Sequence, residues 1–268
     1  MADFAKLTRS RSILSEVTYI TLNLLLAAVV TFMIIITNSP IISITLVILS
    51  KWRIFAVRPR YWFANVKSNM VDFIVGLSFA FIIFTAYSDY LSFTLIILTA
   101  LYAGWLLFIK PRSSTIMMEI QAATALFLGT IAATQALFII EEVTFPTIAS
   151  VFLVVTSFVI GYSVARHILL AGSETGISFM SSIFGLFIAQ LAWISYHWLV
   201  SYSVIGTTLI IPQLSIISTL IGFSVLAVYK SYTNHDGRVR LSDVFVPILF
   251  SLLIIVIMLI GFSDPVIF

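Results

Sequence analysis

Cationic and aromatic side chains alternate in one short polar segment, residues 51–63, and this is the most distinctive chemical pattern in the chain. Aromatic rings favour the depth of lipid headgroups, and each cation near a membrane surface attracts anionic lipid by ~1 kcal/mol. The segment therefore predicts contacts with a lipid headgroup or another phosphate-bearing ligand, through Lys51, Trp52, Arg53, Arg58, Arg60, Trp62 and Lys67. A loop that only anchors the chain and sets its topology has the same composition, and the sequence favours that simpler interpretation. Nucleic acid is not expected as a partner, because the segment adjoins a membrane surface.

Part of this segment has the spacing of a known phosphate-binding motif. Lys51, Arg58 and Pro59 fit K-x6-R-P, which resembles the first motif of the type-2 phosphatidic acid phosphatase family. The resemblance implies that the lysine and the arginine hold a phosphate. In that family a later Ser-Gly-His and a Ser-Arg with a downstream His complete the site, and neither is present here. Without a histidine nucleophile there is no covalent step, so the sequence does not predict this reaction.

A second pattern could bear on metal chemistry. Glu141 and Glu142 are similar to the paired glutamates of CAAX-type intramembrane metalloproteases, whose motif continues to an arginine four positions later. Pro146 stands at that position, and His197 follows Trp193 at the aromatic-xxx-His spacing of the family. A metal site needs converging histidine and carboxylate ligands, and these residues do not supply a set. The chain also has no cysteine, so we predict no metal site and no cofactor.

Isolated polar residues within apolar stretches form a third group of candidates. They are Asn23, Glu119, Gln121, Gln135, Gln190 and His197. A polar residue inside a membrane indicates a possible site or substrate path, but hydrogen bonding between helices explains amides equally well. No Asp, Glu, Lys or Arg lies near the middle of an expected span, and Glu119 is about one turn inside its own. This distribution disfavours transport driven by a buried carboxylate relay.

Composition identifies the elements that must position these residues. Hydrophobic residues make up 61% of the 268-residue chain and charged residues only 9%, whereas a soluble domain needs about a quarter of its residues charged. A membrane-spanning helix needs roughly 20 apolar residues. The apolar stretches predict nine spans, at 17–37, 40–56, 70–87, 90–109, 115–140, 146–169, 175–200, 207–230 and 244–262. The span 40–56 is the doubtful one, because its clean apolar core is short.

The basic residues predict the orientation of these spans. All fourteen Lys and Arg residues fall at the ends of the apolar stretches, always at alternate gaps counted from the N-terminal tail, and the charged residues at the other gaps are all acids. Cations concentrate on the cytoplasmic side of membrane proteins, so we expect the N-terminus inside and the C-terminus outside. If 40–56 did not cross, five cations would face the translocated side. The orientation therefore depends on that doubtful span.

Small residues at spacing four predict how the helices pack. Such residues let helix backbones approach closely in lipid, where hydrophobicity cannot hold helices together. Three consecutive spans carry the pattern small-xxx-Gly-xxx-Ala, at Ala125, Gly129 and Ala133, at Ser157, Gly161 and Ala165, and at Ser181, Gly185 and Ala189. We expect a compact bundle with these three spans at its centre.

The sequence thus predicts an all-α, polytopic integral membrane protein: one transmembrane helical domain over residues 1–268, a bundle of about nine helices. A short cytoplasmic tail, 1–16, and a basic-aromatic cytoplasmic loop, about 51–69, complete it. The preferred function is that of a non-catalytic component of the cytoplasmic membrane: a scaffold, an accessory subunit or a lipid-interacting protein. Its expected partners are anionic lipid and a possible second membrane protein. A carrier or flippase for an apolar or amphiphilic substrate is the first alternative, and an intramembrane enzyme acting on a lipid is the second.

Overall fold

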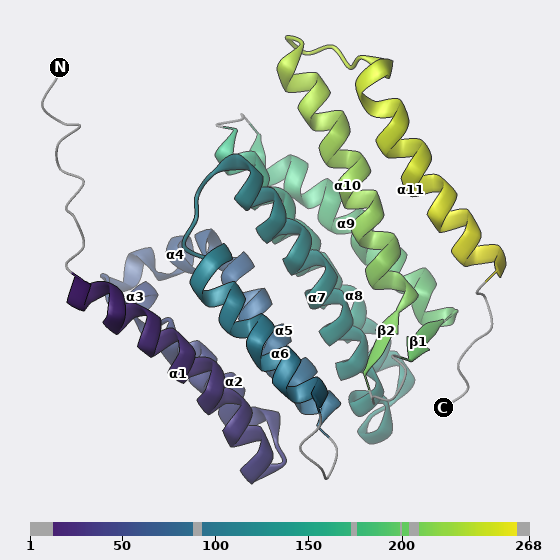
Figure 1. The fold of residues 1–268 in the computed structure, drawn as a ribbon. Coiled ribbons are helices and arrows are strands. Elements are labelled where there is room, and N and C mark those ends of the chain that lie inside the picture. Colours follow the sequence, from purple (N-terminus) through teal and green to yellow (C-terminus); the bar gives the residue numbers. More distant parts are fainter. Residues whose placement is uncertain (1–12, 88–92, 173–175, 199, 204–208, 262–268) are drawn as a thin grey trace, which may run out of the picture.

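The computed structural model describes residues 13–87, 93–172, 176–198, 200–203 and 209–261. These residues are 86% helical, which confirms the all-α fold. The helices form a bundle, seen along its side in Figure 1. Several charged residues used to predict the orientation lie outside the described ranges, namely Lys6, Arg9, Arg11, Asp89, Glu174 and Asp264.

The elements follow one another in this order: α1 (Ile13–Thr37), α2 (Pro40–Ser50), α3 (Trp52–Phe55), the 3-10 helix η2 (Pro59–Tyr61), α4 (Trp62–Ser68), α5 (Met70–Ala86), α6 (Phe93–Gly104), the π-helix η3 (Trp105–Ile109), α7 (Thr115–Val143), α8 (Pro146–Ala171), α9 (Ile177–His197), β1 (Ser201–Ser203), β2 (Ile210–Pro212), α10 (Gln213–Asn234) and α11 (Leu241–Gly261). The two strands pair antiparallel, with Tyr202 opposite Ile211.

Six helices of the described chain are long and apolar enough to cross a membrane: α1, α7, α8, α9, α10 and α11. The number rises to seven if α5 and the bent helical segment before it count as one span, and α2 and the continuous α6–η3 helix are shorter apolar helices. The protein is therefore a membrane protein with several spanning helices. Three of the nine expected spans, 40–56, 70–87 and 90–109, are short or bent.

Two expected spans differ from the observed helices for local reasons. The helix expected at 40–56 ends at Ser50, where the backbone N–H of Lys51 bonds the carbonyl of Ile48. At 1.5 Å per residue α2 is about 16 Å long, about half of the ~30 Å hydrocarbon core. The span expected from 207 begins instead at Gln213, because residues 210–212 pair with β1.

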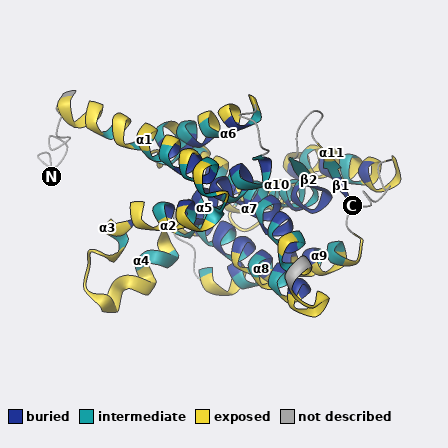
Figure 2. Cartoon of the chain, turned by 90° about the horizontal axis from the view of Figure 1, so that it is seen from below, coloured by how far each residue is buried: buried dark blue, intermediate teal, exposed yellow. Residues whose placement is uncertain are grey.

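The core of the bundle lies around α5 and α7. Most residues of α5 are buried, and α7 packs against α5, α8 and α10. By contrast, α9 packs mainly on α8, and α11 packs on α10, so both lie at an edge. The expected central position of residues 175–200 therefore differs from the observed one. Figure 2 shows the same distribution, with buried residues in the middle and exposed ones on the outer helices.

Glycines bring two pairs of helices close together, α8 with α9 and α7 with α5. A Cβ atom at Gly161 of α8 would lie 2.9 Å from Cγ1 of Ile188 and 3.1 Å from Cα of Gly185, both on α9. A Cβ atom at Gly129 of α7 would lie 2.9 Å from Cγ2 of Ile74 on α5. Among the other small residues of the three patterns, Ala165 is half-buried and the rest are buried, namely Ala125, Ala133, Ser157, Ser181 and Ala189. The small residues thus lie where helices touch.

Candidate functional site

Residues 52–68, here called the interfacial segment, fold into α3, η2 and α4. Arg58 precedes η2 with φ −57° and ψ 138°, and Pro59 occupies the first position of η2, where a proline is tolerated. The indole N–H of Trp62 donates to the carbonyls of Phe55, at 2.9 Å, and Val57, at 3.0 Å. The rings of Phe55 and Trp62 meet edge to face with centroids 5.9 Å apart. These contacts make the segment a folded unit.

The interfacial segment turns away from the axis of the bundle. The helical residues 59–68 make an angle of 70° with α5, which follows them directly. Figure 2 shows α3 and α4 projecting from the body of the molecule, with most of their residues exposed. A segment at this angle to a spanning helix has the geometry of a helix that lies along a membrane surface.

Aromatic rings and cations are exposed together on this segment. Phe63 is 78% exposed and Trp52 64%, with Tyr61 and Trp62 also exposed. The cations exposed beside them are Arg53, Arg58 and Arg60. None of these three arginines forms an ion pair within the described part of the chain, and the guanidinium of Arg60 lies 4.6 Å from the ring of Tyr61. The segment therefore presents unneutralised positive charge next to apolar rings.

The two lysines expected in the same site have other surroundings. Lys67 points its ammonium toward α8, 5.1 Å from the ring centroid of Tyr162. Lys51 is only 5% exposed and forms an ion pair with the carboxylate of Asp72 on α5. Its Nζ also donates to the backbone carbonyl of Asp72, at 3.1 Å. The structure thus separates Lys51 from the arginines of the interfacial segment.

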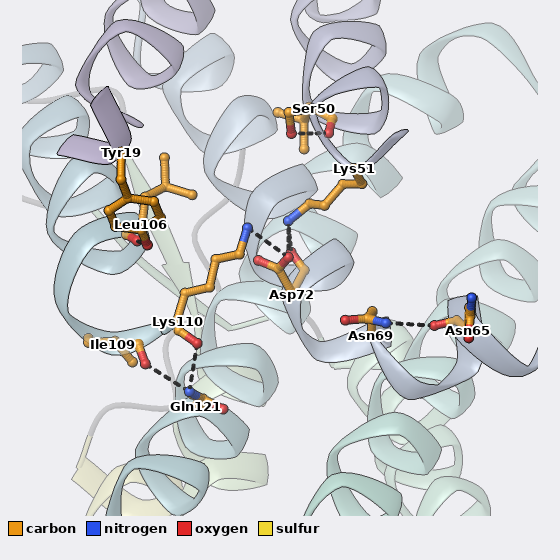
Figure 3. A network of polar contacts seen from close by, with 11 residues as sticks. Tyr19, Ser50, Lys51, Asn65, Asn69, Asp72, Leu106, Ile109, Lys110 and Gln121 are labelled. Atoms are coloured by element: carbon orange, nitrogen blue, oxygen red, sulfur yellow. Dashed lines mark hydrogen bonds and ion pairs between the residues drawn. The ribbon is translucent and has the colours of Figure 1, made fainter. Parts of the chain in front are cut away.

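Asp72 receives a second cation from the end of the π-helix η3. Nζ of Lys110 lies 3.1 Å from Oδ2 of Asp72, and Figure 3 shows both lysines reaching that carboxylate. The carboxylate also lies in the first turn of α5, where the helix dipole favours negative charge. Because the lysines come from the ends of α2 and η3, the ion pairs join three helices at one point.

Gln121 of α7 closes the other side of this region. Its Nε2 donates to the carbonyls of Ile109, at 2.8 Å, and Arg112, at 2.9 Å, and contacts that of Lys110 at 3.4 Å. Its Oε1 lies 2.9 Å from Nε2 of His167 on α8. The carbonyls of Ile109 and Lys110 lie at the end of η3, where helix carbonyls lack the partners of a continuing helix, and the amide of Gln121 supplies a donor there. Gln121 therefore has a structural role as a cap.

The remaining amides expected within spans also make hydrogen bonds, with one exception. Nδ2 of Asn23 donates to the carbonyl of Tyr19 in its own helix, at 2.8 Å. Gln135 of α7 accepts from Oγ1 of Thr85, at 2.6 Å, and donates to the carbonyl of Ile210 in β2, at 3.1 Å. Gln190 of α9 is the exception, since it is exposed and has no hydrogen bond within the described chain. Gln121 and Gln135 thus hold elements together, whereas the hydrogen bond of Asn23 stays within α1.

The last two candidates lie at opposite ends of their helices. Glu119 pairs with Lys230 of α10 at 2.7 Å, near the start of α7. His197 is exposed at the end of α9, where its ring centroid lies 4.7 Å from that of Trp193 and 5.3 Å from that of Tyr196. An aromatic cluster at the end of a span is typical of the membrane interface.

Comparison with known proteins gives no family for this chain: no family model matches it, and neither does a curated protein or a solved structure. The functional interpretation therefore rests on the geometry alone.

Two further features bear on the class of function. Within the described ranges no three His, Asp or Glu side chains are grouped so that they could hold a metal ion. A cavity of about 700 Å³ opens between α7, α8 and α10, and its wall combines the Glu119–Lys230 ion pair with apolar side chains such as Ile168 and Leu226.

Sequence reasoning missed Asp72 and His167 as members of the polar network. A sequence signal for the ion pair between Lys51 and Asp72 does exist. Lys51 lies at the end of one expected span and Asp72 at the start of the next, and their opposite charges could have indicated that they pair. No comparable signal exists for His167, because its partner Gln121 lies on a different helix 46 positions away.

Proposed function

We propose that this chain is a non-catalytic, multi-pass membrane component that binds anionic lipid headgroups through the interfacial segment. The observation that supports this function most directly is the joint exposure of Arg53, Arg58 and Arg60 beside Trp52 and Phe63 on a segment bent away from the bundle. Rings of this kind enter the headgroup region, and the arginines beside them then meet lipid phosphates.

The magnitude of the attraction supports lipid selectivity as well as anchoring. Three exposed cations at ~1 kcal/mol each would together contribute about 3 kcal/mol toward anionic lipid. Arginine also presents a planar fork of donors that can bind phosphate oxygens in pairs. A segment that only anchors the chain and sets its topology has the same composition, so a preference for anionic over zwitterionic lipid is what distinguishes the proposed function from that alternative.

We further propose that the chain crosses the membrane nine times, with the N-terminus inside and the C-terminus outside. The connections that carry cations, from α2 to α5, from η3 to α7 and from α10 to α11, lie toward one end of the molecule. The α1–α2 turn, the α7–α8 connection and the β-hairpin lie toward the other end. A helix as short as α2 can cross where the bilayer thins locally around it.

A carrier receives less support from the geometry. Gln190, expected to line a path, lies on the exposed face of α9, and it is not among the residues around the cavity between α7, α8 and α10. Gln121 and Gln135 are engaged in hydrogen bonds. We therefore retain the membrane-component function.

The test compares lipid selectivity of the full chain in bilayers that contain spin-labelled phosphatidylserine or phosphatidylcholine. We expect the Arg58→Gln/Arg60→Gln double variant to lose selectivity for phosphatidylserine by several-fold, up to ~30-fold if both cations contribute ~1 kcal/mol. The matched control is Arg238→Gln/Arg240→Gln, which removes the same charge from the exposed connection between α10 and α11. An unchanged preference in the first variant, or an equal loss in both, would leave anchoring as the only role of the segment.

A further inference from the structure

Gln190 is a polar side chain on an otherwise apolar, lipid-facing surface of α9. It is exposed and has no hydrogen-bond partner within the described chain. Its position, 13 residues after Ile177, is about 20 Å along the helix. The aromatic residues of the interface, Trp193 and Trp198, follow it toward the end of α9. In the proposed topology α9 crosses the bilayer, and Gln190 then lies about one turn inside these aromatic residues, within the hydrocarbon region.

An amide at this depth is costly when it has no partner. Lipid chains offer no donor or acceptor, and an unsatisfied polar group in hydrocarbon loses hydrogen bonds that water would supply. The other amides of the expected spans, Asn23, Gln121 and Gln135, are satisfied within the chain. Gln190 thus points to a partner outside the monomer.

The surroundings of Gln190 have the pattern of a helix interface. Ile183, Gln190 and His197 recur every seven residues along α9, and the exposed residues between them complete a stripe of Leu186, Phe187, Trp193 and Ile194. A seven-residue repeat keeps one face of a helix in contact with a second helix over several turns. The opposite face of α9, with Gly185, is already packed on α8.

We propose that this stripe is the interface with a second copy of the same chain, in which the two Gln190 amides bond each other across a two-fold axis. If two copies of the chain have the same orientation in the membrane, their two Gln190 side chains lie at the same depth and can meet. An amide has both donors and an acceptor, so it is complementary to itself, as an isologous interface requires. The two α9 helices then run parallel, and apolar side chains pack on either side of the amide pair.

The absence of cysteine from the natural chain makes the test direct. Single cysteines are introduced at Ile183 and Ile194, on the stripe, and at Leu249, an exposed position of α11, as the control. Oxidation in membranes should give disulfide-linked dimers from the two stripe positions and few from the control. Equal cross-linking at Leu249 would reflect random collision and would overturn the proposal.

The amide itself is tested in the Ile194→Cys background. Gln190→Leu should lower the dimer fraction, with about a fivefold or larger loss in the dimerisation constant, whereas Gln190→Asn should largely retain it. Because Gln190 bonds nothing within the described monomer, the leucine variant should unfold in detergent at the same point as the parent. Undiminished dimer in Gln190→Leu, or a cross-linked product of a mass other than twice the chain, would contradict the proposed partner.

Discussion

Lys51 and Arg53 are two positions apart and have opposite surroundings. Lys51 is buried against Asp72, whereas Arg53 is exposed on α3. The difference arises because Lys51 ends α2 on the side that packs against α5, and the chain then turns outward into the interfacial segment. The cation at position 51 therefore has a structural role, whereas the cation at position 53 is exposed at the surface.

Removal of the Asp72 carboxylate should destabilise the protein more than removal of the Lys110 ammonium. Asp72→Asn leaves the buried ammonium of Lys51 without a counter-charge, and the loss of one member of a buried pair costs about 3–5 kcal/mol. Lys110→Met should cost less than ~1 kcal/mol, because that ammonium is one-third exposed. The free energy of unfolding, measured by titration with a denaturing detergent, checks both values.

The double variant Lys51→Met/Asp72→Asn tests whether the loss of stability comes from an unpaired buried charge or from the altered shape of the side chains. A buried methionine and a neutral amide carry no unpaired charge, so we expect this variant to be more stable than Asp72→Asn alone. If the double variant were as unstable as the single one, the ion pair would not be the cause of the loss.

Helix pairs in this bundle depend on how closely their backbones approach. Gly161→Ala would place a methyl group 2.9 Å from Ile188 Cγ1 and 3.1 Å from the backbone of Gly185, so α8 and α9 would have to separate. Overpacking of this kind costs about 1–3 kcal/mol. The control is Gly104→Ala on α6, where nothing lies within 4 Å of the new atom. We expect the control to unfold at the same detergent concentration or a higher one, because alanine favours the helix.

Packing between helices also affects the end of the α6–η3 helix. The apolar sequence at 90–109 predicts an uninterrupted helix, but its last turn is π-helical, from Trp105 to Ile109. Tyr19 of α1 donates to the carbonyl of Leu106 at 3.0 Å, and Gln121 binds the carbonyl of Ile109. Tertiary donors therefore satisfy the carbonyls of this altered turn.

At the scale of the whole molecule, the proposed topology makes opposite predictions for two sets of exposed positions. A cysteine at Ser68 or Asn234 should be inside, and a cysteine at Thr144 should be outside. In right-side-out vesicles an impermeant maleimide should label only Thr144→Cys, and permeabilisation should allow labelling of the other two. Labelling of Ser68→Cys in sealed vesicles would show that the orientation is wrong, and with it the cytoplasmic location of the interfacial segment.

The sequence by itself determined that the chain is an all-helical membrane protein and where most of its helices lie. Hydropathy and length are local properties that add along the chain, and each spanning helix satisfies its own backbone hydrogen bonds. The composition of residues 51–63 is also a local property, and the interfacial role that it indicates stays a prediction. The β-hairpin before α10 was less accessible, because residues 210–212 become a strand only by pairing with β1.

Only the tertiary structure decided which polar residues of the expected spans and of the basic-aromatic loop bond another part of the described chain and which do not. Lys51 and Asp72 are 21 positions apart, and Gln121 and His167 are 46 apart, so their pairing follows from how helices meet and not from local pattern. Packing likewise turned Gln190 outward on an edge helix while Gln121 and Gln135 became bonded inside. The exposure of a side chain depends on which residues surround it in space. Those neighbours come from distant parts of the chain, so the local sequence does not identify them.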